Sequence, residues 1–161
     1  MRIAAADGRQ LISVISDTHG LLRPQALAAL NAAQVIVHAG DIGDPQVLAA
    51  LRGLAPVVAV RGNNDRGAWA RRLPARVTLE IGALRLHVVH DVHDVMLDPA
   101  AAGIAVVIAG HSHRPLLEER NGVLFVNPGS AGPRRFSLPV SLAHLWIEGR
   151  SVRGTLVPLQ V

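Results

Sequence analysis

Short apolar runs alternate with helical stretches over the first 61 residues, and this order restricts the fold more than any other feature. The runs are rich in β-branched residues, as buried strands are. Each helical stretch begins at proline, which the first helical turn tolerates, and Asp44 is suited to cap the second helix. A βαβαβ order predicts a parallel sheet. The predicted strands are Leu11–Ser16, Val35–Ala39 and Val57–Arg61, and the predicted helices are Pro24–Ala33 and Pro45–Arg52.

The second half of the chain predicts mainly antiparallel strands. Asn121-Gly122 separates two apolar runs and is the strongest short hairpin signal in the chain. The predicted strands are Arg76–Ile81, Leu84–His90, Ala105–Ala109, Leu116–Arg120, Val123–Asn127, Val140–Glu148 and Ser151–Val157, and Asp98–Gly103 is expected to form one or two helical turns. No linker or repeat divides the sequence, so residues 1–161 are expected to form a single domain. Met1–Gln10 is expected to be a loose or short leading segment before the first strand.

Composition limits the chemistry and the compartment. Half of the 161 residues are hydrophobic, which favours a folded globular protein. No apolar run reaches the roughly 18–20 residues that a membrane span needs, and the start lacks a signal-peptide core. A soluble, cytoplasmic protein without membrane contact is therefore expected. The chain has no cysteine, which excludes disulfides, thiolate metal sites and cysteine nucleophiles.

The net charge of +4 does not by itself indicate nucleic acid binding. The basic residues are all arginine and are spread from Arg2 to Arg153, with dense groups at Arg71–Arg72 and Arg134–Arg135. Aromatic residues make up 2% of the chain, so the sequence offers no stacking platform for single strands. Nucleic acid is not expected to be the main partner.

Polar clusters follow five of the apolar runs directly, and the carboxyl ends of strands in an open α/β sheet share one rim. Taken alone, Asp17 and His19 also fit a capped turn, and the Gly-Asp and Gly-Asn pairs also fit tight bends. Together the clusters supply the hard and borderline ligands of a site for two metal ions. They are Asp17-Thr18-His19, Gly40-Asp41, Gly62-Asn63-Asn64-Asp65, His90 and Gly110-His111-Ser112-His113.

In this order the motifs resemble the calcineurin-like metallophosphoesterases, and most closely their small bacterial and archaeal YfcE-like phosphodiesterase branch. The resemblance extends from Leu11 to the final hairpin and includes Asn127-Pro128-Gly129-Ser130. It implies an α/β fold, a four-layer α/β/β/α sandwich of the metallo-dependent phosphatase type. It also implies hydrolysis of phosphodiester bonds by a hydroxide that bridges two ions.

The resemblance also implies a role for each matching residue. Asp17, His19 and His113 would hold one divalent ion, Asn63, His90 and His111 would hold the other, and Asp41 would bridge the two. Asp41, Asn63 and His90 would thereby take part in catalysis. The family suggests Mn²⁺, and the ligand types also accept Ni²⁺, Fe²⁺, Zn²⁺ or Mg²⁺.

Two positions depart from the family pattern. Asn64 stands where larger members have a histidine that protonates the leaving group, so His93 becomes a candidate acid, with an exposed loop histidine as the other interpretation. Asp91 stands where the family often has glycine, and it could orient His90 or face solvent. His38 is interpreted as a buried structural histidine, and Asp65 as a residue that fixes the Asn63 turn or orients a ligand histidine.

The sequence is also compatible with a protein-binding scaffold, a different class of function. Relatives of the Vps29 type, a retromer subunit, resemble this fold but serve as protein-binding scaffolds with part of the ligand set lost. The complete ligand set favours an enzyme that acts on a small phosphodiester, although a monoester substrate also remains open. By family likeness, a homodimer or homotetramer is expected.

Overall fold

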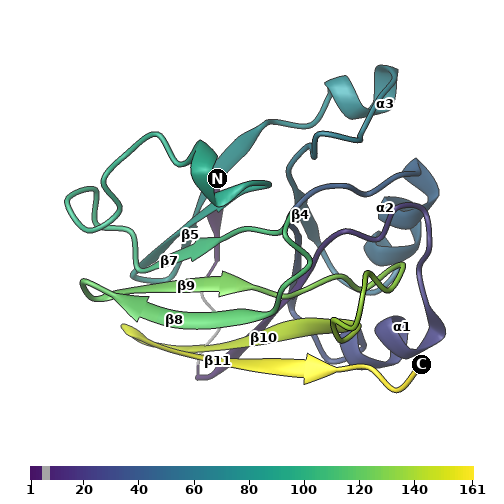
Figure 1. The fold of residues 1–161 in the computed structure, drawn as a ribbon. Helices are drawn as coiled ribbons and strands as arrows, with labels where there is room; N and C mark the ends of the chain where they lie inside the picture. The colour runs from purple at the N-terminus through teal and green to yellow at the C-terminus, as the bar shows by residue number, and fades with distance from the viewer. Residues whose placement is uncertain (5–7) are drawn as a thin grey trace.

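Two β-sheets pack face to face in the computed structural model, which describes residues 1–4 and 8–161 (Figure 1). The six-stranded sheet has the order β1-β5-β6-β7-β9-β8, and the five-stranded sheet has the order β11-β10-β2-β3-β4. The first sheet contains β1 (Arg2–Ile3), β5 (Arg76–Ile81), β6 (Leu84–Val89), β7 (Val106–Ile108), β8 (Leu116–Arg120) and β9 (Val123–Asn127). The second contains β2 (Gln10–Ile15), β3 (Val35–His38), β4 (Val57–Ala59), β10 (Ser141–Glu148) and β11 (Ser151–Pro158).

The βαβαβ opening has the predicted parallel arrangement. Strands β2, β3 and β4 pair in parallel, and they are joined by α1 (Pro24–Leu30) and α2 (Pro45–Arg52). The carboxylate of Asp44 caps α2 by accepting a hydrogen bond of 2.8 Å from the backbone N–H of Gln46. Because all three parallel strands run the same way, the loops that follow them meet at one edge of the sheet.

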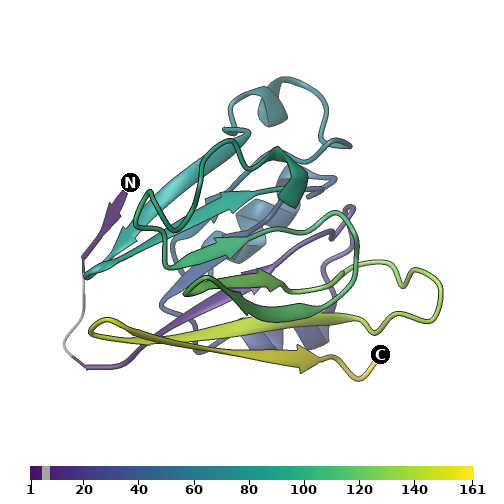
Figure 2. The same ribbon diagram turned by 60° about the vertical axis from the view of Figure 1, so that its left-hand side comes forward.

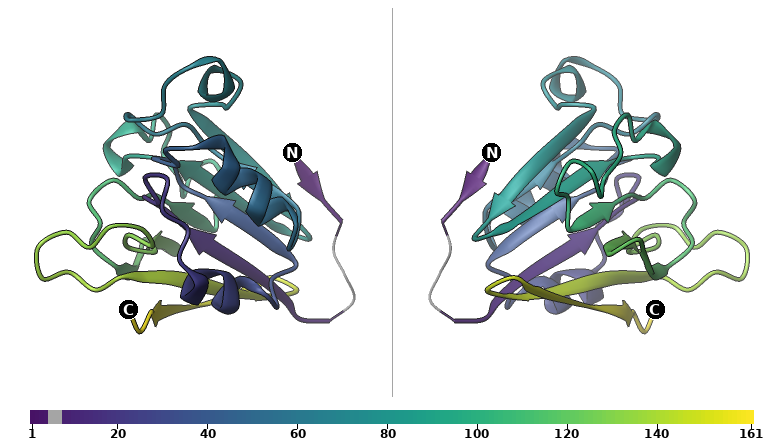
Figure 3. Two further views of the ribbon diagram at one scale, coloured as in Figure 1. Left: turned by 90° about the vertical axis from the view of Figure 1, so that its right-hand side faces the viewer. Right: turned by 90° about the vertical axis from the view of Figure 1, so that its left-hand side faces the viewer.

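Both faces of the five-stranded sheet are buried. Ile12 and Val14 of β2 pack between the two sheets, whereas Ile15 packs with Leu30 of α1 and Leu51 of α2. This double burial explains why every residue of β2 is buried rather than every second one. Figure 3 shows both helices on the outer side of this sheet.

The outer face of the six-stranded sheet has a thinner cover. The short 3₁₀ helix η1 (Val92–Asp94) and the turns that follow it lie over the strands (Figure 2). A small cluster of Ile104, Val107 and Val123 packs under this segment, with Phe125 at its side. The predicted sandwich of two sheets between outer helical layers is confirmed, and the layer over this sheet is the weaker one.

Three segments differ from the sequence prediction. Arg2–Ile3 of the predicted leading segment is an edge strand that pairs in parallel with β5, and Arg2 binds Glu80 at 2.9 Å; residues 5–7 lie outside the described part. Asp98–Gly103 forms consecutive turns instead of a helix, ended by Gly103 with φ of +72°. Helix α3 (Ala68–Arg71) was not predicted, because four residues are too few to show a helical period.

Within the described residues, no helix combines the length and the apolar character that crossing a membrane requires.

Candidate metal centre

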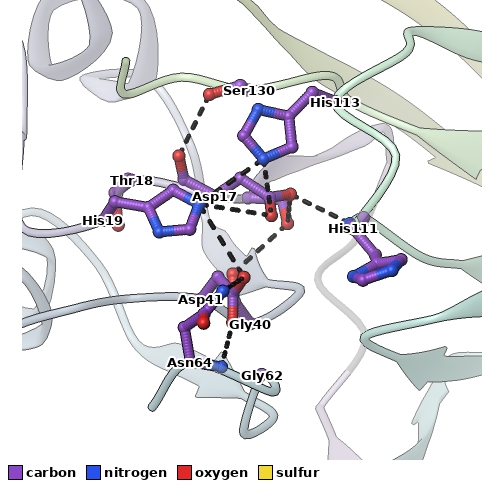
Figure 4. Close-up of polar contacts among 12 residues, drawn as sticks. Asp17, Thr18, His19, Gly40, Asp41, Gly62, Asn64, His111, His113 and Ser130 are labelled. Atoms are coloured by element: carbon purple, nitrogen blue, oxygen red, sulfur yellow. Dashed lines mark hydrogen bonds and ion pairs between the residues drawn. The ribbon is translucent and has the colours of Figure 1, made fainter. Parts of the chain in front are cut away.

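The polar clusters meet at the edge where the parallel strands end (Figure 4). The loops after β2 and β3 are joined by backbone hydrogen bonds, from Asp17 N to Gly40 O at 3.0 Å and from His19 N to Asp41 O at 2.9 Å. A further bond joins Gly110 N to His90 O at 2.8 Å and holds the loops after β6 and β7 together. These bonds tie the loops in two pairs, and a bond of 3.1 Å from the backbone N–H of His111 to Asp17 Oδ2 joins one pair to the other.

Asp17, His19 and His113 form the first group of donors. The Nε2 atom of His113 lies 3.3 Å from Asp17 Oδ1 and 3.4 Å from Nε2 of His19, which is itself 3.8 Å from the same oxygen. Ligands that surround an ion at about 2.0–2.2 Å are separated by roughly 3–3.6 Å. Two of the three distances lie in this range and the third is slightly longer, so the group suits a shared ion.

Asn63, His90 and His111 form the second group. The side-chain oxygen of Asn63 lies 2.9 Å from Nε2 of His90 and 3.2 Å from Nδ1 of His111. The Nδ1 atom of His90 lies 2.7 Å from the backbone oxygen of Ala39. That contact fixes the ring so that Nε2 points toward the other donors.

Asp41 lies between the two groups. Its Oδ2 atom is 3.7 Å from Nε2 of His19 in the first group and 3.3 Å from Nε2 of His90 in the second. No contact with Asp41 was predicted for Asn64, but its backbone N–H donates to Asp41 Oδ1 at 2.9 Å and its amide donates to Oδ2 at 2.8 Å. Asn64 thus holds the carboxylate that faces both groups, although it cannot act as an acid.

The arrangement fits divalent ions. Asp17 is fully buried, and its Oδ1 atom has no hydrogen-bond partner among the described residues. A buried carboxylate oxygen without a partner is costly unless a cation is to meet it. Asp17, His19 and His113 can place their donor atoms within 4.8 Å of one another, and so can Asp17, Asp41 and His90.

The charges of the centre favour ionised carboxylates. Burial raises the pKa of Asp41, but hydrogen bonds from His90 and Asn64 outweigh it and hold the pKa below its usual range. Burial likewise raises the pKa of Asp17, and the neighbouring His113 and Ser16 reverse that effect. For His90, burial lowers the pKa, but Asp41, the backbone oxygen of Ala39 and Asp17 together raise it above its usual value. A metal ion would take the place of the His90 proton, since ligand histidines are neutral.

The backbone is strained where the ligands lie. Five of the seven predicted ligands have φ between +47° and +69°, a region that non-glycine residues seldom occupy. They are Asp17, His19, Asp41, His111 and His113. Each such residue costs on the order of 1 kcal/mol, and residues of this kind cluster at functional sites.

Buried polar residues hold the loops in this form. The imidazole of His38 lies 3.0 Å from the hydroxyl of Thr18, and its complete burial lowers its pKa to about 4. Asp65 accepts hydrogen bonds from the backbone of Gly43 at 2.9 Å and of Gly62 at 2.8 Å. The contacts of His38 and Asp65 match the structural roles expected for them. Ser130 donates to the backbone oxygen of Asp17 at 3.0 Å.

Asp91 and His93 lie beside the centre rather than in it. Asp91 accepts a hydrogen bond from His93 at 2.9 Å and approaches Nε2 of His111 at 3.7 Å. It does not orient His90, whose Nδ1 is occupied by a backbone oxygen. The side chain of His93 is 87% exposed. Arg61, which the sequence did not single out, lines a depression together with Asn63, His90 and His111.

Comparison with known families decides the assignment. The family model of the calcineurin-like phosphoesterase superfamily domain matches residues 11–150. The chain belongs to this superfamily. The assignment confirms the family, the fold class and the class of metal-dependent phosphoesterase that the motifs predict. Divalent metal ions are the cofactors that the family implies.

Known proteins of similar sequence and fold agree with this assignment. A probable metallophosphoesterase of Methanocaldococcus jannaschii is 34% identical over 95% of this chain and 83% of its own length. The solved structure of an archaeal phosphodiesterase superposes with a TM-score of 0.77 at 26% identity, over 92% of this chain and all of that one. Vacuolar protein sorting 29 of Cryptosporidium parvum superposes with a TM-score of 0.81 at 19% identity, over 96% and 93%. The last likeness concerns the fold alone.

Proposed function

We propose that the protein hydrolyses phosphodiester bonds at a centre of two divalent ions. The three residues of each donor group would hold one ion, and Asp41 would be the seventh ligand. The single observation that carries the proposal is the position of Asp41 Oδ2, within 3.7 Å of His19 Nε2 and 3.3 Å of His90 Nε2. A carboxylate between two donor groups suits the 3.5–4 Å separation of ions in two-metal sites. Residues 1–161 would act as one metallophosphoesterase domain.

The residues of the centre would divide the work. Bound ions would supply a water of lowered pKa and neutralise the charge of the phosphate. Asp17, His19 and His113 would fix the first ion, and Asn63, His90 and His111 the second. Asn63 contributes a neutral oxygen, which keeps the second position less negative and favours an anionic substrate. Arg61 lines the adjoining depression and adds positive charge there.

A diester is favoured over a monoester. The side-chain amide of Asn64 donates its hydrogen bond to Asp41 and cannot protonate a leaving group. A monoester carries a second negative charge and asks for more cationic groups than Arg61 supplies. The likeness to an archaeal phosphodiesterase supports the same choice. Manganese remains the first ion to try.

Metal analysis combined with hydrolysis of bis(4-nitrophenyl) phosphate tests the proposal. We expect two ions per chain after loading with Mn²⁺, and turnover that chelation abolishes and added Mn²⁺ restores. The same assay with 4-nitrophenyl phosphate should give the lower kcat/KM. Absence of both bound metal and turnover under all conditions would instead favour a protein-binding scaffold of the Vps29 type.

We also propose that His93 protonates the leaving group. Its imidazole is anchored by Asp91 and lines a cavity that reaches His111. General acids contribute about 10²–10⁴-fold, and the contribution grows as the leaving group becomes more basic. His93→Ala should therefore lower kcat for an alkyl 4-nitrophenyl diester little, but should lower it about 10²-fold where an alkoxide leaves. Equal rates of variant and wild type on the poor leaving group would refute this role.

A further inference from the structure

A cavity of about 180 Å³ opens on the outer face of the six-stranded sheet, beside the candidate metal centre. His111 and Asp91 form its end nearest the metal ligands. Its walls come from η1, β7, β8 and β9, on the side of the sheet that faces the viewer in Figure 2. The apolar residues that line it include Val92, Val107, Leu116, Phe125 and Val126.

The cavity exists because this face of the sheet has a thin cover. The short η1 and the turns after it cover this face incompletely, and the space between them and β8 stays open. Val92 is 39% exposed and Leu116 is 36% exposed at its rim. At the far end the guanidinium of Arg120 lies 4.8 Å from the centre of the Phe125 ring, where Glu118 binds it at 2.7 Å.

Its size suits one ring. An engineered apolar cavity of about 150 Å³ binds benzene, and sites for larger ligands usually exceed about 300 Å³. The space beside His111 therefore accepts a single aromatic ring with small substituents. It is too small for a folded segment of another protein.

The cavity and the metal centre share a wall. His111 directs Nδ1 toward Asn63 Oδ1 at 3.2 Å, and its ring also lines the cavity. The depression lined by Arg61, Asn63 and His90 shares both Asp91 and His111 with the cavity. An ester group on a phosphate held in that depression would thus find the apolar space next to it.

We propose that this cavity is the subsite for an aromatic ring esterified to the substrate phosphate, which makes aryl phosphodiesters the preferred substrate class. The inference rests on the proposed function, since it places the phosphate at the metal centre. Burial of the ring against Val107, Leu116 and Phe125 would supply selectivity that the metal ligands cannot, because they meet only the phosphate.

Calorimetric titration of the Mn²⁺-loaded protein with phenylphosphonate and methylphosphonate tests the subsite without relying on turnover. The two ligands share a head group and differ by the ring, so the ratio of their Kd values reports the cavity. We expect phenylphosphonate to bind about tenfold more tightly, which is the scale of discrimination by apolar pockets. Equal Kd values in the wild type would overturn the proposal.

Variants of β8 and β9 show whether the preference for the ring arises in the cavity. Leu116→Trp narrows the cavity at its rim, and we expect the ratio of Kd values to fall close to one. Glu119→Trp adds the same side chain on the opposite face of the strand and should keep the wild-type ratio. Phe125→Ala removes one wall and should lower the ratio as well. A ratio unchanged in both cavity variants would contradict the assignment.

The methyl NMR signals of Val92 and Val107, which line the cavity, show whether this inference and the proposed function hold or fail separately. If these signals shift with phenylphosphonate while no diester is hydrolysed, the cavity stands and the proposed function fails. If diesters are hydrolysed but neither signal shifts and no ring preference appears, the cavity fails alone. Tighter binding of N-acetylphenylalanine amide than of phenylphosphonate would assign the cavity to a protein side chain and overturn the proposal.

Discussion

Replacement of Asp41 by asparagine is expected to lower kcat/KM for bis(4-nitrophenyl) phosphate by at least about 10³-fold, or about 4 kcal/mol of transition-state stabilisation. Asp41 is the proposed bridge, and an amide has one oxygen where the carboxylate has two. The variant also loses the negative charge that faces His19 and His90. Metal analysis should find two ions per wild-type chain and at most one in the variant.

Asp44→Asn is the matched control for this change. Asp44 lies three residues further along the same loop, and its carboxylate caps α2 rather than facing the donor groups. Asparagine caps helices about as well as aspartate, so activity and metal content should stay within about twofold of the wild type. Full activity in Asp41→Asn would show that the bridging role is wrong. A loss in both variants would point to damage of the loop instead.

The sequence predicted those parts of the fold whose signals are local. Strands β8 and β9 have the predicted bounds, because two apolar runs flank an Asn121-Gly122 turn in which both residues adopt positive φ. The edge strand β1 was not predicted, because only its pairing with β5 identifies these two residues as a strand. Helix α3, with four residues, and η1, with three, are too short to show a repeating hydrophobic pattern.

In the candidate site, too, some features could be predicted from the sequence and others could not. The ligand types could be read from short motifs, and the structure brings all seven together, although their roles remain a proposal. The hydrogen bonds from Asn64 to Asp41 could not be read, since they depend on how the loops after β3 and β4 meet. The left-handed backbone conformation at Asp17, Asp41 and His113 could not be predicted from the sequence either, because aspartate and histidine do not require it.

Gly62 lies directly against Asp41, and its lack of a side chain leaves room for that residue. A Cβ atom at Gly62 would overlap the backbone nitrogen and the Oδ1 atom of Asp41 and would lie 2.8 Å from its Cα atom. Displacements of about 1 Å at a reacting centre cost roughly 10²-fold in rate. Gly62→Ala is therefore expected to lower kcat/KM by at least about 10²-fold and to weaken metal binding.

Gly53→Ala separates this steric effect from the general consequences of adding a methyl group. Gly53 ends α2 with φ of −67°, and a Cβ there would meet the backbone oxygen of Ala50 at 3.2 Å, far from the donor groups. Circular dichroism and thermal unfolding should show that both variants keep the fold, since Gly62 lies in a loop beyond the end of β4. Activity and metal content should fall in Gly62→Ala and remain close to the wild type in Gly53→Ala. Normal activity of Gly62→Ala would mean that Asp41 can move away from the added methyl group without loss of function. That result would contradict the proposed role of Asp41, because its carboxylate must reach both groups of donors.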